Sequence, residues 1–404
     1  MRTLIARFVV PTAATAAVLL AGAALGNDLG ASHHAQQPKQ YQVTNLSSLG
    51  GPVSRGDSIN NRSWVAGYST LAGGQTRHAS LWRDGSQTDL GTLGGPNSSV
   101  VWPVKNEIGV ITGIAQKAEA DPLNEDWSCS AFFPGSAPTG HICLGFAWRR
   151  GVMRELPTLG GNNGFATGAN NRDEVVGWAE NTVHDPTCVP PQVLQFRAVV
   201  WTLGGDRPRE LPLIPGDTSS AATAINDQGQ VVGISGICDQ AVGRFTAAHA
   251  VLWERGKVTD IGNLGANAWN TPMAINQQGD VAGFADTPGD DPNQANFLHA
   301  FLWTKHDGIR DLGALPGDVF SEALGINDQG QVVGTSCDAN GACRAFLYQD
   351  GQMTDLNTLV APGYTDVLTT AQDINDRGEI TGRAFNASTG EKPAFLATPL
   401  ANRR

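Results

Sequence analysis

The feature that most constrains this chain is a ten-residue stretch that returns seven times, with starts 46 to 64 residues apart. Every copy has an Asn at its third position and a Gly at its tenth. A repeat of this length is one supersecondary unit, which buries its apolar face only by stacking on its neighbours. The copies are SINNRSWVAG (58–67), VKNEIGVITG (104–113), GANNRDEVVG (168–177), AINDQGQVVG (224–233), AINQQGDVAG (274–283), GINDQGQVVG (325–334) and DINDRGEITG (373–382).

Two further motifs recur in step with the first. One is an aromatic strand typified by HAFLW (299–303), and the other is a strand and turn typified by TDLGTLGG (88–95). Each unit therefore reads as four short strands. We term them A (ending at the repeated Asn), B (ending near the repeated Gly), C (the aromatic strand) and D. Four strands at a period of about 50 residues predict one blade of a β-propeller.

The strand D motif is displaced between the two ends of the chain. The last unit lacks it, and a spare copy, TNLSSLGG (44–51), precedes the first unit. We predict that YQVTNL (41–46) pairs with PAFLAT (393–398), because this completes the last blade and leaves no open sheet edge. The expected fold is all-β: a seven-bladed β-propeller of four-stranded blades over residues 41–400, with the ring closed by an N-terminal strand.

The first 26 residues have the pattern of an export signal peptide. Arg2 and Arg7 are followed by an apolar stretch that ends in small residues. A membrane anchor is the alternative, although Pro11 and a run of Ala make this stretch a poor span. Residues 27–40 are expected to be a flexible segment. No later stretch approaches ~18 unbroken apolar residues, so we expect no membrane span and a secreted or periplasmic monomer.

The net charge of the chain is −11, and removal of the two signal arginines would leave −13. A nucleic-acid-binding protein needs a basic face, so we expect no nucleic-acid partner. Charged residues are 16% of the chain and Gly occurs 49 times. Low charge with many glycines and short apolar runs is typical of β structure with many turns.

Each repeated residue has an expected structural role. The Asn and the Gly three residues after it, as in Asn226 and Gly229, suit the turn between strands A and B. The Gly at the tenth position predicts close packing of a backbone or ring against strand B. The large rings of strand C are expected in the core between blades rather than in a sugar-binding site. These rings are Trp82, Trp148, Trp201, Trp253, Trp303 and Tyr348.

The unit with HAFLW, MTDLG, AIN and GQVVG is similar to the extracellular HAF repeat, named for its His-Ala-Phe triplet. The triplet is intact at 299–301, His78 and His249 keep only the His-Ala pair, and Arg197 and Arg344 replace the His. The resemblance covers about residues 41–399. It implies a secreted bacterial β-propeller without an assigned activity or catalytic residues. We expect the strand C His to make a structural hydrogen bond.

The long insertions all fall in the loops between strands B and C, at about 116–144, 180–196, 236–248 and 286–298. Insertions on one face of a repeat protein often form its binding face. Tryptophans and carboxylates gather there, as suits a carbohydrate or peptide ligand, although some of these rings would only pack. The candidate ligand-binding residues are Trp102 (on strand A just inside the face), Trp127, Trp178, Trp269, Asp126, Asp185, Asp239 and Asp290.

Six cysteines in an exported chain predict disulfides. They allow fifteen pairings, of which the simplest joins Cys129 to Cys143, Cys188 to Cys238 and Cys337 to Cys343. Such bridges would stiffen the loops of a binding face, or they would only protect an exported protein.

The stretch DTPGDDPNQ (286–294) contains Asp286, Asp290 and Asp291, which could supply oxygen ligands to calcium. It lacks the spacing of a known calcium loop, so a solvated acidic loop is the alternative. No other cofactor is expected.

We expect a non-catalytic binding protein, whose carbohydrate or protein ligand lies on the face with the long B–C loops. No nucleophile elbow, HExxH motif or phosphate loop occurs, so no catalytic residue is assigned. The alternative is an extracellular polysaccharide lyase or hydrolase with its site on the same face, where two carboxylates from separate loops would suffice. A purely structural surface protein is a third hypothesis.

Overall fold

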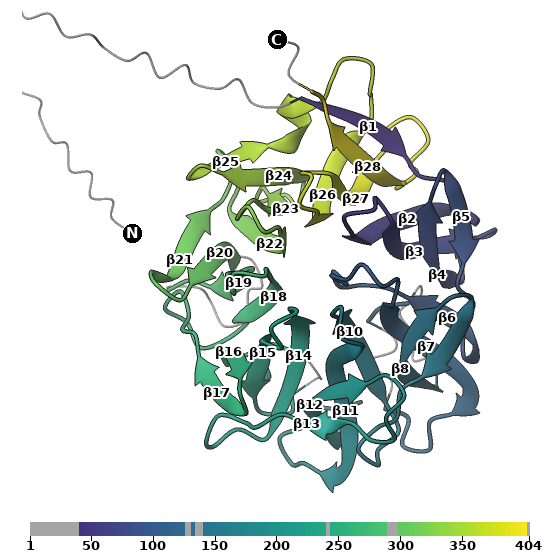
Figure 1. Ribbon diagram of the computed structural model, residues 1–404, viewed down its shortest axis with the longest axis vertical. Coiled ribbons are helices and arrows are strands. Elements are labelled where there is room, and N and C mark those ends of the chain that lie inside the picture. Colours follow the sequence, from purple (N-terminus) through teal and green to yellow (C-terminus); the bar gives the residue numbers. More distant parts are fainter. Residues whose placement is uncertain (1–39, 126–130, 134–139, 240–242, 289–297, 402–404) are drawn as a thin grey trace, which may run out of the picture. The chain divides into compact units, whose positions relative to one another are not determined.

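The computed structural model describes residues 40–125, 131–133, 140–239, 243–288 and 298–401. These residues form seven four-stranded antiparallel sheets arranged as the blades of a ring (Figure 1). The predicted fold class is therefore confirmed. In the described part of the chain no helix is long and apolar enough to cross a membrane.

Blades are numbered by the order of their strand A along the chain. Blade 1 consists of β2 (Gly50–Ile59), β3 (Val65–Leu71), β4 (Arg77–Arg83) and β5 (Ser86–Asp89), and blade 2 of β6 (Gly94–Ser99), β7 (Ile111–Ala120), β8 (His141–Arg149) and β9 (Val152–Glu155). Blade 3 consists of β10 (Gly164–Ala169), β11 (Glu174–His184), β12 (Leu194–Thr202) and β13 (Arg209–Glu210). Blade 4 consists of β14 (Ser219–Ile225), β15 (Val231–Gly236), β16 (His249–Glu254) and β17 (Lys257–Asp260). Blade 5 consists of β18 (Thr271–Ile275), β19 (Val281–Asp286), β20 (Leu298–Thr304) and β21 (Gly308–Gly313), and blade 6 of β22 (Phe320–Ile326), β23 (Val332–Cys337), β24 (Cys343–Gln349) and β25 (Gln352–Asp355). Blade 7 consists of β26 (Val367–Ile374), β27 (Ile380–Phe385), β28 (Ala394–Pro399) and β1 (Tyr41–Asn45). The 3₁₀ helix η1 (Leu356–Leu359) lies between blades 6 and 7.

Strand β1 closes the ring as the displaced motif predicts. It pairs antiparallel with β28, from Tyr41 opposite Pro399 to Asn45 opposite Phe395. Blade 7 thus combines the first strand of the described sequence with the last three (Figure 1). The predicted signal peptide (1–26) lies outside the described residues, as does all of the predicted flexible segment (27–40) except its last residue.

The repeated Asn makes the A–B turn and also joins neighbouring blades. In blade 4, Asn226 Oδ1 accepts the backbone N–H groups of Gln228 and Gln230, at 3.0 and 3.1 Å. Its Nδ2 donates to the carbonyl of Asn276, the equivalent residue of blade 5, at 3.0 Å. Asn106 departs from this pattern, because its Nδ2 donates to Val110 of its own turn. The predicted turn role is therefore confirmed, with an interblade role added.

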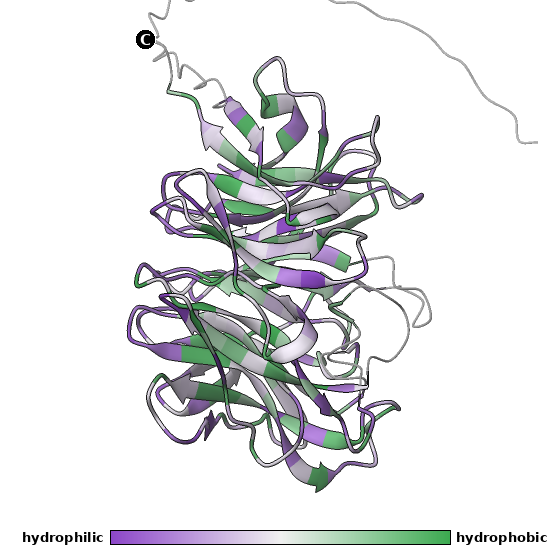
Figure 2. Cartoon of the chain, turned by 90° about the vertical axis from the view of Figure 1, so that its right-hand side faces the viewer, coloured by the Kyte–Doolittle hydropathy of each residue, from purple (hydrophilic) through white to green (hydrophobic). Residues whose placement is uncertain are grey.

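The large rings of strand C lie in the core between blades. The Trp201 Nε1 donates to the carbonyl of Pro157 at 2.8 Å, and the Trp253 Nε1 to that of Pro212 at 2.6 Å. Each acceptor belongs to the preceding blade. The predicted core role is confirmed, and the view from the side shows hydrophobic residues along the strands and hydrophilic ones in many of the turns (Figure 2).

The Gly of strand B is required by a close approach of two backbones. A Cβ at Gly334 would meet the carbonyl of Glu322 on strand A and, at 2.7 Å, the ring of Phe346 on strand C. Strand A carries a register shift beside this point, between Ala323 and Gly325. Because neither neighbour can move without disturbing the sheet, the position excludes any side chain.

Two of the three predicted disulfides lie wholly within the described residues, and both are present. Cys188–Cys238 joins B–C loops of blades 3 and 4, and Cys337–Cys343 closes the B–C loop of blade 6. Of the third predicted pair, Cys129 lies outside the described residues.

The strand C His makes a structural hydrogen bond, as expected. His78 Nδ1 lies 2.8 Å from Asp89 Oδ2, and His299 Nδ1 lies 2.9 Å from Asp311 Oδ2. In blade 6 Arg344 replaces the His and contacts Asp355 at 3.1 Å. In blades 1, 5 and 6 the His or Arg therefore ties strand C to strand D, whereas His249 of blade 4 contacts Asp217, on the link that precedes strand A, at 3.0 Å.

Candidate functional site

Two separate cavities lie at the centre of the ring. The turns between strands A and B border one, at what we term the A–B mouth. The ends of the strands that lead into the B–C loops border the other, at the B–C mouth.

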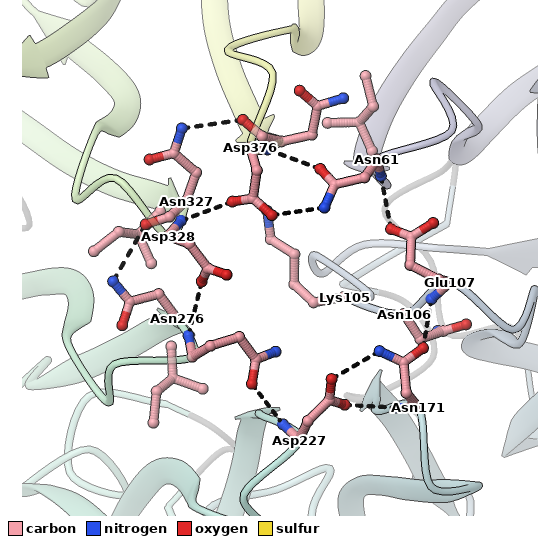
Figure 3. Close-up of a pocket in the computed structure, with 15 residues that line it drawn as sticks. Asn61, Lys105, Asn106, Glu107, Asn171, Asp227, Asn276, Asn327, Asp328 and Asp376 are labelled. Atoms are coloured by element: carbon pink, nitrogen blue, oxygen red, sulfur yellow. Dashed lines mark hydrogen bonds between the residues drawn. The ribbon is translucent and has the colours of Figure 1, made fainter.

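The A–B mouth is ringed by one residue from each blade, the one that follows the repeated Asn (Figure 3). The backbone N–H of each of these residues donates to the side-chain oxygen of the equivalent residue in the next blade, at distances of 2.7 to 3.1 Å. The circle runs without a gap through Asn61, Glu107, Asn171, Asp227, Gln277, Asp328 and Asp376. We term it the A–B ring, and the cavity inside it measures about 160 Å³.

A buried ion pair lies beneath the A–B ring. Lys105 takes the place that Ile has in most copies of the repeat. Its Nζ lies 2.5 Å from Asp373 Oδ1 and donates to the Ile374 carbonyl at 2.6 Å. Burial raises the pKa of the Asp373 carboxyl, while Lys105 and the N–H of Ile59 oppose that rise. The polar groups of this mouth thus have partners within the protein.

The B–C mouth opens into a larger cavity of about 460 Å³, which we term the central cavity. Inner strands of most blades contribute to it, so residues from distant parts of the sequence meet there. One group of lining residues is apolar and another is polar. The apolar group includes Trp102, Phe132, Ile234, Trp269, Met273, Phe284, Phe320 and Leu324, and the polar group includes Arg55, Glu322, Gln372 and Arg383.

Trp269 stands at the central cavity in an unfavourable backbone conformation. Its φ is +52°, in the left-handed region that bulky residues rarely adopt. Its N–H donates to the carbonyl of Arg244 at 3.1 Å, and the side chain is half-buried. Strained residues of this kind cluster at functional sites, because the surroundings must hold them in place.

Beside the cavity, arginines surround a buried carboxylate. The Arg55 guanidinium lies 2.5 Å from Asp57 Oδ1, while Asp57 Oδ2 is buried without a partner. Burial raises the pKa of Asp57 to about 6, and the arginines oppose that rise. Arg77 lies over the ring of Tyr68, with 3.8 Å between the guanidinium carbon and the ring centroid. Burial acts to raise the pKa of the Tyr68 phenol, but Arg55 and Arg77 outweigh it, so this pKa is lowered.

Glu322 projects from β22 into the same cavity. Burial raises its pKa to about 7, and Arg55 only partly opposes that effect. No hydrogen bond to its carboxyl group is found within the described ranges. A carboxyl group that titrates near neutral pH inside a cavity can carry or release a proton under physiological conditions.

Unpartnered polar groups distinguish the central cavity from the other hollows. Gln372 is 3% exposed and its Oε1 has no hydrogen-bond partner among the described residues. The indole N–H of Trp102, which is 8% exposed, likewise has none there. A larger groove of about 700 Å³ lies between β1 and the turns of blade 1, but no buried unpartnered atom belongs to its described lining. Since buried polar groups are normally satisfied, the central cavity is the candidate site.

Two of the predicted ligand-binding residues, Trp102 and Trp269, line the central cavity. Trp178 does not line it and is one of the rings that only pack, because its side chain is 1% exposed and contacts Phe165 with ring centroids 4.6 Å apart. Inward-facing strand B residues of this blade belong to the core. Trp127, Asp126, Asp290 and Asp291 lie outside the described residues.

The predicted aspartates that are described hold their own loops. Asp185 accepts the N–H of Thr187 at 2.8 Å and the Nε2 of Gln195 at 3.0 Å. Asp239 accepts the N–H of Phe245 at 2.9 Å, next to the Cys188–Cys238 bridge. Neither lines the central cavity, and Asp286, which is buried near Arg244, does not line it either.

Acidic residues of blades 2 and 3 form a separate buried cluster. Glu125 accepts the backbone N–H groups of Val193 and Leu194. Glu180 accepts the N–H of Asn163 at 2.8 Å, and burial together with Glu125 raises the pKa of Glu180 to about 8. Within the described part of the chain no group of three or more acidic, His or Cys side chains is arranged to hold a metal ion. The cluster therefore docks one B–C loop against the next.

The charged residues of the cavity were not predicted from the sequence, although they stand out as exceptions to the repeat. Five residues before the repeated Asn, blades 2 to 5 and 7 carry Val, Phe, Ala or Thr, whereas Arg55 and Glu322 stand there in blades 1 and 6. Directly after the repeated Gly, most blades carry an apolar or aromatic residue, and blade 7 carries Arg383. Aligning the copies and marking charged exceptions at inward positions would have found all three.

Comparison with known proteins identifies no family and finds only weak likenesses. No protein-family model matches the chain, and no curated protein matches it. Among solved structures it is similar to a gluconolactonase from Xanthomonas campestris (12% identity, 64% of this chain and 79% of that chain covered, TM-score 0.34). It is also similar to an arabinanase from Bacillus subtilis (12%, 56% and 90%, TM-score 0.25) and to dipeptidyl peptidase 4 from Porphyromonas gingivalis (9%, 81% and 44%, TM-score 0.30). Likenesses of this strength carry no argument about activity.

Proposed function

We propose that this propeller is an exported, non-catalytic binding protein that takes a carbohydrate ligand in the central cavity at the B–C mouth. The observation that carries the proposal is Trp269, an aromatic side chain held at this cavity in a left-handed backbone conformation. A solvent-facing ring kept in an unfavourable conformation is typical of a binding residue.

The composition of the cavity supports a carbohydrate. Ligand sites of about 300–1,000 Å³ combine apolar walls with a few convergent polar groups, and the cavity of about 460 Å³ fits this description. Trp102 and Trp269 offer rings for the apolar face of a sugar, and Gln372 and Arg383 offer hydrogen bonds for its hydroxyl groups. The two disulfides support a location outside the cytoplasm, secreted or periplasmic.

A glycan array tests the proposal, with the protein applied in calcium and in chelator. We expect Trp269→Ala to lower the affinity for the bound glycan about tenfold or more, as for a buried aromatic contact. The matched control is Trp64→Ala, since Trp64 lies in the A–B turn of blade 1 and not at this cavity. A wild-type protein that binds no glycan in either buffer, but binds a protein, would contradict the carbohydrate assignment. Loss of binding in chelator would support a calcium site that includes residues of the 286–291 loop.

A second function, an extracellular polysaccharide lyase or hydrolase, draws support from Glu322. Its carboxyl group lies in the cavity with a pKa of about 7, which suits general acid or base catalysis. Incubation with polysaccharides, followed by assays for new reducing ends and for unsaturated sugars, tests this function. Turnover that is lost in Glu322→Gln while binding persists would favour the enzyme. Absence of turnover on every glycan that binds would favour the binding protein.

A further inference from the structure

The polar side of the central cavity has more cationic than anionic groups. Arg55, Arg77 and Arg383 all lie close enough to Asp57 to lower the pKa of its carboxyl group. Of the three, only Arg55 forms an ion pair with it. Arg77 is engaged by the ring of Tyr68 and by the carbonyl of Phe132, to which it donates at 2.6 Å. One buried aspartate thus faces three guanidinium groups.

The carboxyl group of Glu322 does not neutralise this excess of positive charge. Glu322 has a pKa of about 7, so at neutral pH it carries only part of a negative charge. The Asp57 carboxylate is already bound to Arg55 through Oδ1. A site with this excess of positive charge attracts an anion, and the low dielectric of a cavity strengthens the attraction.

Arg383 is the guanidinium left for such an anion. It lines the cavity from β27 and is half-buried. Within the described residues its side chain has no hydrogen bond or ion pair. Arg presents parallel N–H groups that match the two oxygens of a carboxylate, and those of Arg383 are not taken up by any acceptor of the described residues. Gln372, buried with an unpartnered Oε1, lines the same cavity from β26 of the same blade.

We infer that the ligand of the central cavity is an acidic sugar of the uronate class, whose carboxylate binds Arg383 while its ring packs against Trp269. The carboxylate supplies the missing negative charge, and Gln372 Oε1 accepts a hydrogen bond from a ring hydroxyl. This inference rests on the proposed function and narrows its ligand from carbohydrates in general to carbohydrates that carry a carboxylate.

The test compares each acid with its neutral ester by calorimetric titration. The probes are oligomers of galacturonate, glucuronate, mannuronate and guluronate, each as the free acid and as the methyl ester. We expect at least one acid to bind the wild-type protein about tenfold or more tightly than its ester, as for a charge-assisted hydrogen bond. Added NaCl should weaken binding of the acid and leave that of the ester nearly unchanged.

Two variants assign the effect to a residue. Arg383→Gln should bind acid and ester equally, and Arg383→Lys should retain part of the preference, because it keeps the charge and loses the planar fork. Arg207→Gln, an exposed change on the link between β12 and β13, is the control and should behave as wild type. The melting temperature of each variant shows whether it folds.

The outcomes separate this inference from the proposed function. Equal binding of acid and ester, weakened in both cases by Trp269→Ala, would overturn the inference and leave the proposed function standing. Retention of the full acid preference in folded Arg383→Gln would also overturn it. Binding of an acidic peptide without binding of any glycan would overturn both.

Discussion

The A–B mouth and the B–C mouth are built from the same repeat. They differ in whether their polar groups have hydrogen-bond partners within the described residues. At the A–B mouth, the side chain after the repeated Asn accepts a hydrogen bond from the preceding blade in all seven blades (Figure 3). At the B–C mouth, Arg55, Glu322 and Arg383 interrupt the repeat, and polar groups remain without partners. Residues that follow the repeat satisfy one another's hydrogen bonds, whereas the residues that depart from it at the B–C mouth leave polar groups available to a ligand.

The strongest test of the closed A–B mouth is removal of its buried cation. Lys105→Ile restores the residue of most other copies but leaves the buried Asp373 carboxylate uncompensated. Breaking one side of a buried ion pair costs about 3–5 kcal/mol, so we expect a loss of this size in the free energy of unfolding at pH 7, measured with urea. The loss should shrink at acidic pH, where Asp373 becomes protonated.

The double variant Lys105→Ile/Asp373→Ala is the matched control. It carries the residues that Ile225 and Ala224 have in blade 4 and should recover most of the stability. A loss below about 1 kcal/mol in the single variant at pH 7 would mean that the pair behaves as an exposed one.

The disulfides allow the rigidity of the B–C mouth to be tested. A bridge stabilises a protein mainly by restricting the unfolded chain, more strongly for a longer loop. Cys188–Cys238 spans 50 residues and Cys337–Cys343 spans 6. Replacing both cysteines by Ser should therefore cost about 4 kcal/mol for the first pair and about 2 kcal/mol for the second. Thermal unfolding measures the stability lost in each variant. Equal losses for the two pairs would show that loop length does not determine how much a bridge stabilises the protein.

A comparison within the A–B turns tests the interblade bonds. Asn327 donates to the carbonyl of Asn375 in the next blade and accepts two backbone N–H groups of its own turn. Among the described residues, the Asn106 side chain bonds only to Val110 of its own turn. We expect Asn327→Ala to cost about 2–3 kcal/mol and Asn106→Ala about 1 kcal/mol, from the buried groups each leaves unsatisfied. Equal losses in urea unfolding would show that the turn, not the interblade bond, provides the stability.

The smallest expected effect concerns pH at the B–C loops. The pKa of Glu180 is about 8 in the folded protein and 4.5 ordinarily, so the folded state holds its proton more tightly. Stability therefore falls as the pH rises from about 4.5 to about 8. Glu180→Gln removes this dependence, so its free energy of unfolding relative to wild type should rise between pH 5 and pH 9. Melting temperatures across that range provide the measurement, and parallel curves for the two proteins would contradict it.

Repetition explains how much of this molecule could be predicted from its sequence. The blades, the role of Asn226 and the closure by residues 41–46 follow from patterns that each copy confirms. The cavity could not be predicted in the same way, because its shape depends on how seven strands A are spaced around the axis. Trp178 shows the difficulty: it occupies the same repeat position as Arg383, yet it meets a ring at Phe165, whereas Arg383 faces the cavity.

The closing strand β1 also sets an order of events for the nascent chain. Residues Tyr41–Asn45 are the first part of the ring to leave the ribosome, and their partner Ala394–Pro399 is the last. The segment 41–45 therefore has no strand to pair with until the last residues of the ring have been made, and the closed ring forms only after that point.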